Sequence, residues 1–158
     1  MPTNLVKSEQ ADYNDYDSAQ HFNDKVVASL IRDFAASSEN GFLVYFSDHG
    51  EEVFDIPPYH ILGRNEAAPI RPMYEIPFII WQSPQWINTH QRHLDTMVNR
   101  PYSIMHLIHT WSDLAGLDYD GLDVTKSVIN KDLKPSHRYI GDAYNKQQPL
   151  KTYDQLKK

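Results

Sequence analysis

The stretch GFLVYFSDHG, residues 41–50, decides the fold class and supplies the first candidate site. Residues 42–46 are all apolar or aromatic and lack the alternation of a strand that faces water on one side. This run predicts a strand that is buried on both faces. The polar residues Ser47, Asp48 and His49 follow at its carboxyl end, which is where ligands bind in open α/β sheets.

The segments on either side of this strand predict the layers that cover it. Apolar residues recur every three or four positions between Ser18 and Ser37, which is typical of a helix with one buried face. Residues 1–17 are polar and aperiodic, and we interpret them as a lead-in that needs a neighbour to become ordered. A second apolar strand is expected at Phe78–Gln82, after a long proline-containing loop over residues 52–72. A helix that precedes a buried strand favours an α/β fold, and we expect a three-layer α/β/α sandwich.

Further elements are predicted in the second half of the chain. A polar helix should begin at Ser83 and Pro84 and run to about Val98. Another should begin at Ser103 and end at Gly116, with one apolar face made of Ile104, Leu107, Ile108, Trp111, Leu114 and Ala115. Short extended pieces are expected near residues 123–129 and 138–140.

Composition excludes several classes of protein. The 158 residues are 41% hydrophobic and 23% charged, which suits a chain with a real core rather than a disordered one. With a net charge of −6 and no run of lysine or arginine, we expect no nucleic-acid partner. The absence of cysteine excludes disulfides, thiolate metal sites and cysteine nucleophiles. We expect no signal peptide and no membrane span within these residues, and the oligomeric state is left open.

Asp48 and His49 are candidate metal ligands. A carboxylate and an imidazole suit zinc, with manganese as an alternative. Neighbouring residues in a regular strand point to opposite faces, so both reach one ion only if the backbone bends, and Gly50 permits such a bend. An Asp-His-Gly sequence is also compatible with a plain turn. Two ligands are fewer than the three that catalytic zinc normally takes.

Four motifs, met in order along the chain, carry a family resemblance. They are GFLVYFSDHGEEVFD (41–55), GRNE (63–66), MYEIPFIIW (73–81) and HTWSDLAG (109–116). Together they resemble the carboxyl-terminal part of a phosphoethanolamine transferase of the lipopolysaccharide-core type, a family in the sulfatase-like branch of the alkaline phosphatase superfamily. The resemblance extends from about Tyr13 to Tyr153, and it implies that residues 18–158 form the carboxyl-terminal part of a sulfatase-like catalytic domain.

The resemblance also implies an activity and its residues. It implies zinc-dependent transfer of phosphoethanolamine from a phosphatidylethanolamine donor to a lipopolysaccharide acceptor, either lipid A or a core sugar. Asp48 and His49 match the zinc pair of the family. His60 is the candidate catalytic residue that contacts the phosphoryl group or a second metal, although a plain loop histidine is the alternative.

The family's threonine nucleophile and acidic zinc ligand precede the matched region. We therefore expect the chain to be a fragment that is inactive alone, from a parent that is anchored in the inner membrane by its amino-terminal part and faces the periplasm. Other interpretations remain open: a sulfatase, a phosphoglycerol transferase, or a non-catalytic truncated module.

Each remaining polar candidate has two interpretations, one as a functional residue and one as a residue that only supports the fold. Arg64, Asn65 and Glu66 either contact an anionic substrate or form a loop salt bridge. Glu51 is expected to orient the loop or a ligand from behind the metal pair. The pairs His90 with His93 and His106 with His109 have a spacing that permits metal binding on a helix, but hydrogen-bonded helix residues are the favoured interpretation.

Overall fold

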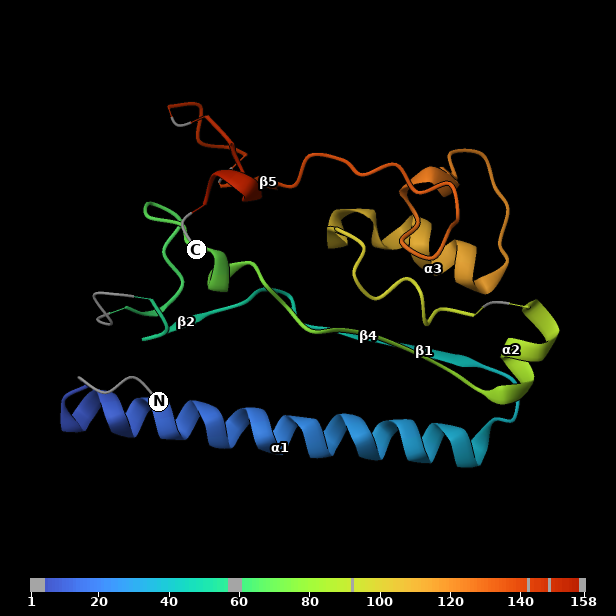
Figure 1. The fold of residues 1–158 in the computed structure, drawn as a ribbon, viewed down its shortest axis with the longest axis horizontal. Coiled ribbons are helices and arrows are strands. Elements are labelled where there is room, and N and C mark those ends of the chain that lie inside the picture. The colour runs from blue at the N-terminus through green and yellow to red at the C-terminus, as the bar shows by residue number, and fades with distance from the viewer. Residues whose placement is uncertain (1–4, 57–60, 92, 142, 148, 157–158) are drawn as a thin grey trace.

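The computed structural model describes residues 5–56, 61–91, 93–141, 143–147 and 149–156. Figure 1 shows three layers: helix α1 (Lys7–Ser37), a ribbon of strands β1 (Phe42–Phe46) and β4 (Phe78–Gln82), and a layer that contains α3 (Leu107–Ala115). The predicted α/β/α arrangement and both predicted strands are confirmed. The strands pair antiparallel, with Val44 opposite Ile80.

The side chains of the ribbon alternate between the two helical layers. Phe42, Val44, Phe78 and Ile80 pack against a core of Leu114, Val128 and Ile129 beneath α3. On the other face, the ring of Trp81 meets Phe34 of α1 at 5.9 Å, and the hydroxyl of Tyr45 accepts a hydrogen bond from Asn23 of α1 at 2.5 Å. The ribbon is thus covered on both faces, which explains why its sequence does not alternate.

The remaining elements are short. A second antiparallel pair consists of β2 (Glu52–Val53) and β3 (Leu62–Gly63), and a third of β5 (Tyr139–Ile140) and β6 (Lys151–Thr152). Helix α2 (Pro84–His90) follows β4, and 3₁₀ turns are formed by Arg71–Met73, Ile104–His106, Val124–Lys126 and Tyr153–Gln155. No helix in the described ranges is both long and apolar enough to cross a membrane.

Helix α1 begins at Lys7 rather than at Ser18, so the expected helix start is wrong. The backbone N–H of Val6 donates to the carboxylate of Glu9 at 2.9 Å, which caps the first turn. Tyr13 and Tyr16 then pack on a small core of Leu5, Val53 and Phe54. These two tyrosines therefore extend the packed face of α1 into its first turns, although the sequence of that segment is mostly polar.

Two other expectations about helices also need correction. Helix α2 ends at His90, well before Val98, because Gln91 adopts a left-handed conformation with φ of 53° and its N–H closes on the carbonyl of Ile87. The residues of α3 that are most buried are Thr110, Ser112, Asp113 and Leu114, whereas Ile108 and Trp111 are 57% and 43% exposed. The predicted apolar face of this helix is therefore only partly its buried face.

The predicted limits of α2 and α3 and the two expected extended pieces can be compared with the structure in the same way. Helix α2 begins directly after Ser83, close to the predicted start, and the hydroxyl of Ser83 caps it by accepting a hydrogen bond from the N–H of Trp86. Gly116 ends α3 as predicted, in a left-handed conformation. The extended piece expected near 138–140 is confirmed as β5, but residues 124–126 form a 3₁₀ turn rather than a strand.

Candidate metal centre and adjoining cavity

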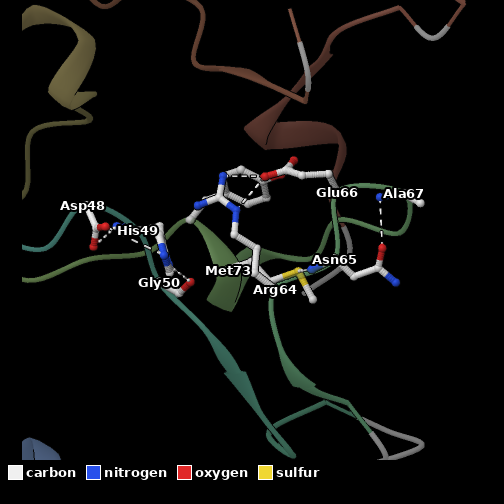
Figure 2. Close-up of polar contacts among 9 residues, drawn as sticks. Asp48, His49, Gly50, Arg64, Asn65, Glu66, Ala67 and Met73 are labelled. Carbon is white, nitrogen blue, oxygen red and sulfur yellow. Dashed lines mark hydrogen bonds and ion pairs between the residues drawn. The ribbon is translucent and has the colours of Figure 1, made fainter. Parts of the chain in front are cut away.

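The candidate metal pair lies where the chain leaves β1. The hydroxyl of Ser47 donates to the carbonyl of His49 at 2.8 Å, which turns the backbone out of strand geometry directly after Phe46. The N–H of His49 donates to Asp48 Oδ1 at 3.0 Å. These local bonds bring adjacent side chains, which a regular strand would separate, to the same side of the loop. Figure 2 shows the two residues together at the end of the strand.

The imidazole of His49 is held in one tautomer. Its Nδ1 lies 3.0 Å from the carbonyl oxygen of Gly50. A carbonyl only accepts hydrogen bonds, so Nδ1 carries the proton and Nε2 retains a free lone pair. This is the arrangement in which histidine binds a metal through Nε2 while a backbone carbonyl orients the ring.

The second potential ligand is close to this nitrogen. Asp48 Oδ2 lies 3.8 Å from His49 Nε2. Two ligands with bonds of about 2.0–2.2 Å to one tetrahedral zinc lie roughly 3.4 Å apart, so a small side-chain movement suffices for both to bind one ion. The N–H of His49, which donates to this carboxylate, is the main cause that holds the pKa of Asp48 below its ordinary value, so the carboxylate is ionised near neutral pH.

Gly50 fixes this loop against the segment that follows it. Its N–H donates to the carbonyl of Met73 at 3.2 Å. A Cβ at this position would lie 2.1 Å from the carbonyl oxygen of Pro72 and 2.5 Å from that of Glu75. The backbone approaches so closely that only glycine fits, which explains the glycine in the Asp-His-Gly motif.

A cavity of about 520 Å³ opens beside Asp48 and His49. This volume is within the range of small-molecule sites. Its charged lining residues include Arg64, Glu75 and Arg138, which we call the polar wall. Its apolar lining residues, which we call the apolar wall, include Ile80, Leu94, Met97, Val98, Ile104 and Ile129. The cavity therefore suits a ligand with one charged end and one apolar end.

Arg64 belongs to a cluster on the polar wall. Its Nε and Nη2 each lie 2.5 Å from the same carboxylate oxygen of Glu66, and its guanidinium lies 4.8 Å from the ring centre of Tyr74. The hydroxyl of Tyr74 donates to the other oxygen of Glu66. Burial, and then this hydrogen bond, raise the pKa of Tyr74 to about 12. The expected loop salt bridge is thus present, and Arg64 still lines the cavity beside the metal pair (Figure 2).

Asn65, between these two charged residues, has a local role. Its side-chain oxygen accepts the N–H of Ala67 at 3.0 Å, and its own N–H donates to the sulfur of Met73 at 3.3 Å. Asn65 therefore shapes the loop that presents Arg64.

Sequence reasoning missed a second cluster on the same wall. The guanidinium groups of Arg138 and Arg71 lie 4.2 Å and 5.0 Å from the centre of the Tyr153 ring. Its hydroxyl donates to the carboxylate of Glu75, and Arg138 also pairs with Asp154 at 2.7 Å. The only signal in the sequence was the strand expected at residues 138–140, which holds Arg138. The partners Tyr153 and Glu75 are 78 positions apart.

The other candidates lie elsewhere or have other partners. His60 lies outside the described residues. Glu51 is exposed. Because α2 ends at His90, that residue and His93 do not share a helix face; the imidazole of His90 stacks on Trp86 at 3.8 Å.

The second histidine pair is also engaged in hydrogen bonds. His109 Nδ1 accepts the N–H of Asp123 at 3.2 Å, and His106 Nε2 lies 2.8 Å from the hydroxyl of Ser136. Within the described ranges no group of three or more histidine, aspartate or glutamate side chains is arranged to hold a metal ion, so Asp48 and His49 form a pair without a third ligand there.

The chain is similar over almost its whole length to curated phosphoethanolamine transferases. The chain is 56% identical over 156 residues to the phosphoethanolamine transferase EptC of Escherichia coli (strain K12), which covers 99% of this chain and 27% of the relative. It is 53% identical over 156 residues to the phosphoethanolamine transferase CptA of Salmonella typhimurium (strain LT2), with the same coverage. The chain thus spans about a quarter of the length of these relatives.

A solved structure shares the fold. The crystal structure of the C-terminal periplasmic domain of EcEptC from Escherichia coli, in complex with Zn, matches with a TM-score of 0.95 at 56% identity, over 99% of this chain and 43% of that chain. The resemblance to phosphoethanolamine transferases is therefore confirmed. Residues 3–117 match the Sulfatase family. Because this match extends over most of the sequence, the chain belongs to the sulfatase family.

Proposed function

We propose that this chain supplies the Asp48 and His49 ligands of a zinc site in a phosphoethanolamine transferase. The donor is phosphatidylethanolamine, the acceptor is lipopolysaccharide, through lipid A or a core sugar, and the reaction takes place at the periplasmic face of the inner membrane. One observation carries the proposal: an ionised carboxylate and an imidazole with a free Nε2 lie 3.8 Å apart at the end of β1, beside a cavity with a charged and an apolar wall.

The two side chains fit a zinc ion in their chemistry. Imidazole nitrogen and carboxylate oxygen are both zinc ligands, and the carbonyl of Gly50 orients the ring from behind. When bound, the metal would polarise a phosphoryl oxygen and assist ionisation of an attacking hydroxyl. Manganese also accepts this pair, and it remains the alternative ion. His60 remains a proposed contact to the phosphoryl group, outside the described residues.

The walls of the cavity suit the proposed donor. The guanidinium groups of Arg64 and Arg138 lie on the polar wall, where they would attract a phosphodiester anion. The apolar wall, with Leu94, Met97 and Val98, offers surface to the lipid part and would exclude water from the reacting group. A small inorganic ester would leave this second wall unfilled.

A metal titration tests the pair without relying on activity. The 158-residue chain is titrated calorimetrically with zinc and with manganese, and the same is done for Asp48→Ala and for the control Asp118→Ala, whose parent residue is exposed and does not line the cavity. We expect Asp48→Ala to lose at least about tenfold in zinc affinity, since half of the pair is removed. Equal affinity of the two variants would contradict the assignment.

An assay of transfer tests the reaction itself. The assay uses membranes from cells that express the proposed longer parent protein, of which this chain is the carboxyl-terminal part. The membranes are given a fluorescent phosphatidylethanolamine, and modified lipopolysaccharide is detected by mass spectrometry. We expect transfer by the wild type and none by Asp48→Ala. Release of sulfate from an aryl sulfate without transfer would favour a sulfatase instead. We also predict that the 158 residues alone turn over no donor, and activity of the purified chain would overturn that prediction.

A further inference from the structure

Arg64, Glu66 and Tyr74 form a closed set of contacts at the edge of the cavity. The Nε and Nη2 atoms of Arg64 each lie 2.5 Å from the same carboxylate oxygen of Glu66. The hydroxyl of Tyr74 donates to the other oxygen of that carboxylate, and the guanidinium of Arg64 lies 4.8 Å from the centre of the Tyr74 ring. Because each side chain contacts the other two, we call this set the arginine triad.

Backbone contacts tie the arginine triad to the metal pair. The N–H of Asn65, next to Arg64, donates to the sulfur of Met73 at 3.3 Å. Met73, next to Tyr74, is fully buried, and its carbonyl accepts the N–H of Gly50 at 3.2 Å. The segments that carry Arg64, Tyr74 and the metal pair therefore all contact one buried residue, which fixes the arginine triad relative to the pair.

The guanidinium of Arg64 faces the cavity, and Glu66 lies behind it. Arg64 lines the cavity with a side chain that is 32% exposed, whereas Glu66 is outside the lining. Figure 2 shows the guanidinium between the carboxylate of Glu66 and the loop of Asp48 and His49. Glu66 binds the N–H groups of Nε and Nη2, and a guanidinium has five N–H donors in a planar fork, so further donors remain for a ligand.

The carboxylate of Glu66 has two opposite effects on the binding of an anion. Its negative charge offsets that of Arg64 and weakens the attraction for an anion. Its contacts also restrict the long arginine side chain, so less side-chain freedom is lost when a ligand binds. The hydroxyl of Tyr74 strengthens this second effect because it fixes the carboxylate. Burial, and then the bond to Glu66, raise the pKa of Tyr74 to about 12, so the hydroxyl remains a donor near neutral pH.

We propose that Glu66 and Tyr74 are positioning residues, which hold Arg64 in the orientation in which it contacts the phosphodiester group of the donor. The identity of this ligand rests on the proposed function. The non-bridging oxygens of a diester match the planar fork of a guanidinium, and a restricted Arg64 makes this contact without reorganising. Glu66 acts through Arg64 rather than on the ligand, because it lies outside the lining of the cavity.

A binding titration separates the two effects of Glu66 by their opposite signs. The 158-residue chain without metal is titrated with dihexanoylphosphatidylethanolamine, and binding is followed by nuclear magnetic resonance of the methyl group of Met97, which lines the cavity. We expect Glu66→Ala to weaken binding about fivefold, because Arg64 is then no longer held. Tighter binding by Glu66→Ala would mean that the carboxylate acts only through its charge, and it would overturn the proposal. Absence of binding by the wild-type chain would also overturn it.

Double variants show whether the effect passes through Arg64. Tyr74→Phe keeps the ring beside the guanidinium and removes only the hydroxyl, and it should also weaken binding about fivefold. In an Arg64→Ala background, Glu66→Ala and Tyr74→Phe should each change the affinity by less than about twofold, since the residue that they position is gone. Equal weakening in both backgrounds would indicate a general structural effect and overturn the positioning role.

Two exposed positions provide matched controls. Glu39→Ala removes a carboxylate and Tyr119→Phe removes a phenol hydroxyl, and both residues lie outside the lining of the cavity. Neither variant should change the affinity for the lipid. A loss in these controls as large as in Glu66→Ala and Tyr74→Phe would reduce the effect to general charge or stability and overturn the proposal.

The Nε–H resonance of Arg64 provides a spectroscopic readout. It should shift in the wild type when the lipid is added, and it should already be displaced in ligand-free Tyr74→Phe. Dihexanoylglycerol, which lacks the phosphodiester, should leave it in place, and an equal shift with that lipid would overturn the contact.

These measurements involve neither zinc nor transfer, so the two proposals fail separately. Loss of the coupling between Arg64 and its two partners would overturn the positioning role even if Asp48→Ala loses zinc affinity as expected. Unchanged zinc affinity in Asp48→Ala would instead contradict the metal assignment and leave the coupling intact.

Discussion

Gly50 is the residue on which the geometry of the metal pair depends most directly. It connects His49 to β2, and it lies so close to the carbonyl oxygens of Pro72 and Glu75 that no side chain can enter. These oxygens belong to the backbone and cannot rotate away. The position of the His49 ring is set by the carbonyl of the same glycine. A displacement of this one residue therefore changes both the packing of the loop and the direction of Nε2.

We predict that Gly50→Ala lowers the free energy of unfolding by about 3 kcal/mol, because the new methyl group overlaps fixed backbone. Urea denaturation measures this value. Gly63→Ala is the control: its Cβ would meet nothing within 4 Å, and only its φ of +94° is unfavourable, so its cost should be about 1 kcal/mol. A smaller loss for Gly50→Ala than for Gly63→Ala would show that the close approach is not tight in solution.

Glu52 makes stability depend on pH. It is fully buried, its Oε2 has no hydrogen-bond partner among the described residues, and burial raises its pKa above the ordinary value. The folded chain then binds this proton more tightly than the unfolded chain, so stability falls as pH rises from the ordinary pKa through the raised one. Glu52→Gln should remove this loss.

We therefore expect the free energy of unfolding of Glu52→Gln, relative to the wild type, to increase as the pH rises above the ordinary pKa of glutamate. Chemical denaturation at several pH values measures the difference. Glu51→Gln, which changes the adjacent exposed carboxylate, is the matched control. If both variants follow the same pH profile, burial of Glu52 is not the cause.

At the scale of elements, Thr110 joins α3 to the segment after it. This threonine is fully buried; its hydroxyl donates to the hydroxyl of Tyr102 and accepts the N–H of Val128 at 3.1 Å. Thr110→Val keeps the shape and removes both bonds, so we predict a loss of about 2–3 kcal/mol in the free energy of unfolding. Thermal and urea denaturation provide the measurement. Thr89→Val, at an exposed position of α2, should change stability by less than about 0.5 kcal/mol, and a similar value for Thr110→Val would contradict its role.

The same helix shows where sequence patterns stop being informative about elements. The strands β1 and β4 were predictable because each is an uninterrupted apolar run, covered on both faces. In α3 the inward face is partly polar, since Thr110 and Asp113 are buried beside Leu114 and form hydrogen bonds there. Hydrophobic periodicity reports only apolar burial, so it assigned Ile108 and Trp111 to the core instead.

At the scale of the whole molecule, the metal pair was predictable but the walls of the cavity were not. Asp48 and His49 are adjacent in sequence, and their place after a buried strand is itself a local signal. Tyr153 and Glu75 are 78 positions apart, and they meet because β5 and β6, of two residues each, return the end of the chain to the turn at residues 71–73. Such short strands have no periodicity, and contacts at this separation leave no pattern in a single sequence.

The contacts of Tyr153 lead to a prediction about the closure of the whole fold. Its hydroxyl bond to Glu75 and its ring contacts with Arg71 and Arg138 hold the pair β5 and β6 to the wall of the cavity. Tyr153→Ala removes all three contacts, and amides of β5 and β6 should exchange with solvent at least about tenfold faster, as measured by hydrogen exchange. Tyr153→Phe keeps both arginine contacts, each worth about 0.5–1 kcal/mol, and should have a smaller effect. Unchanged exchange in Tyr153→Ala would mean that the two strands hold their place without this anchor.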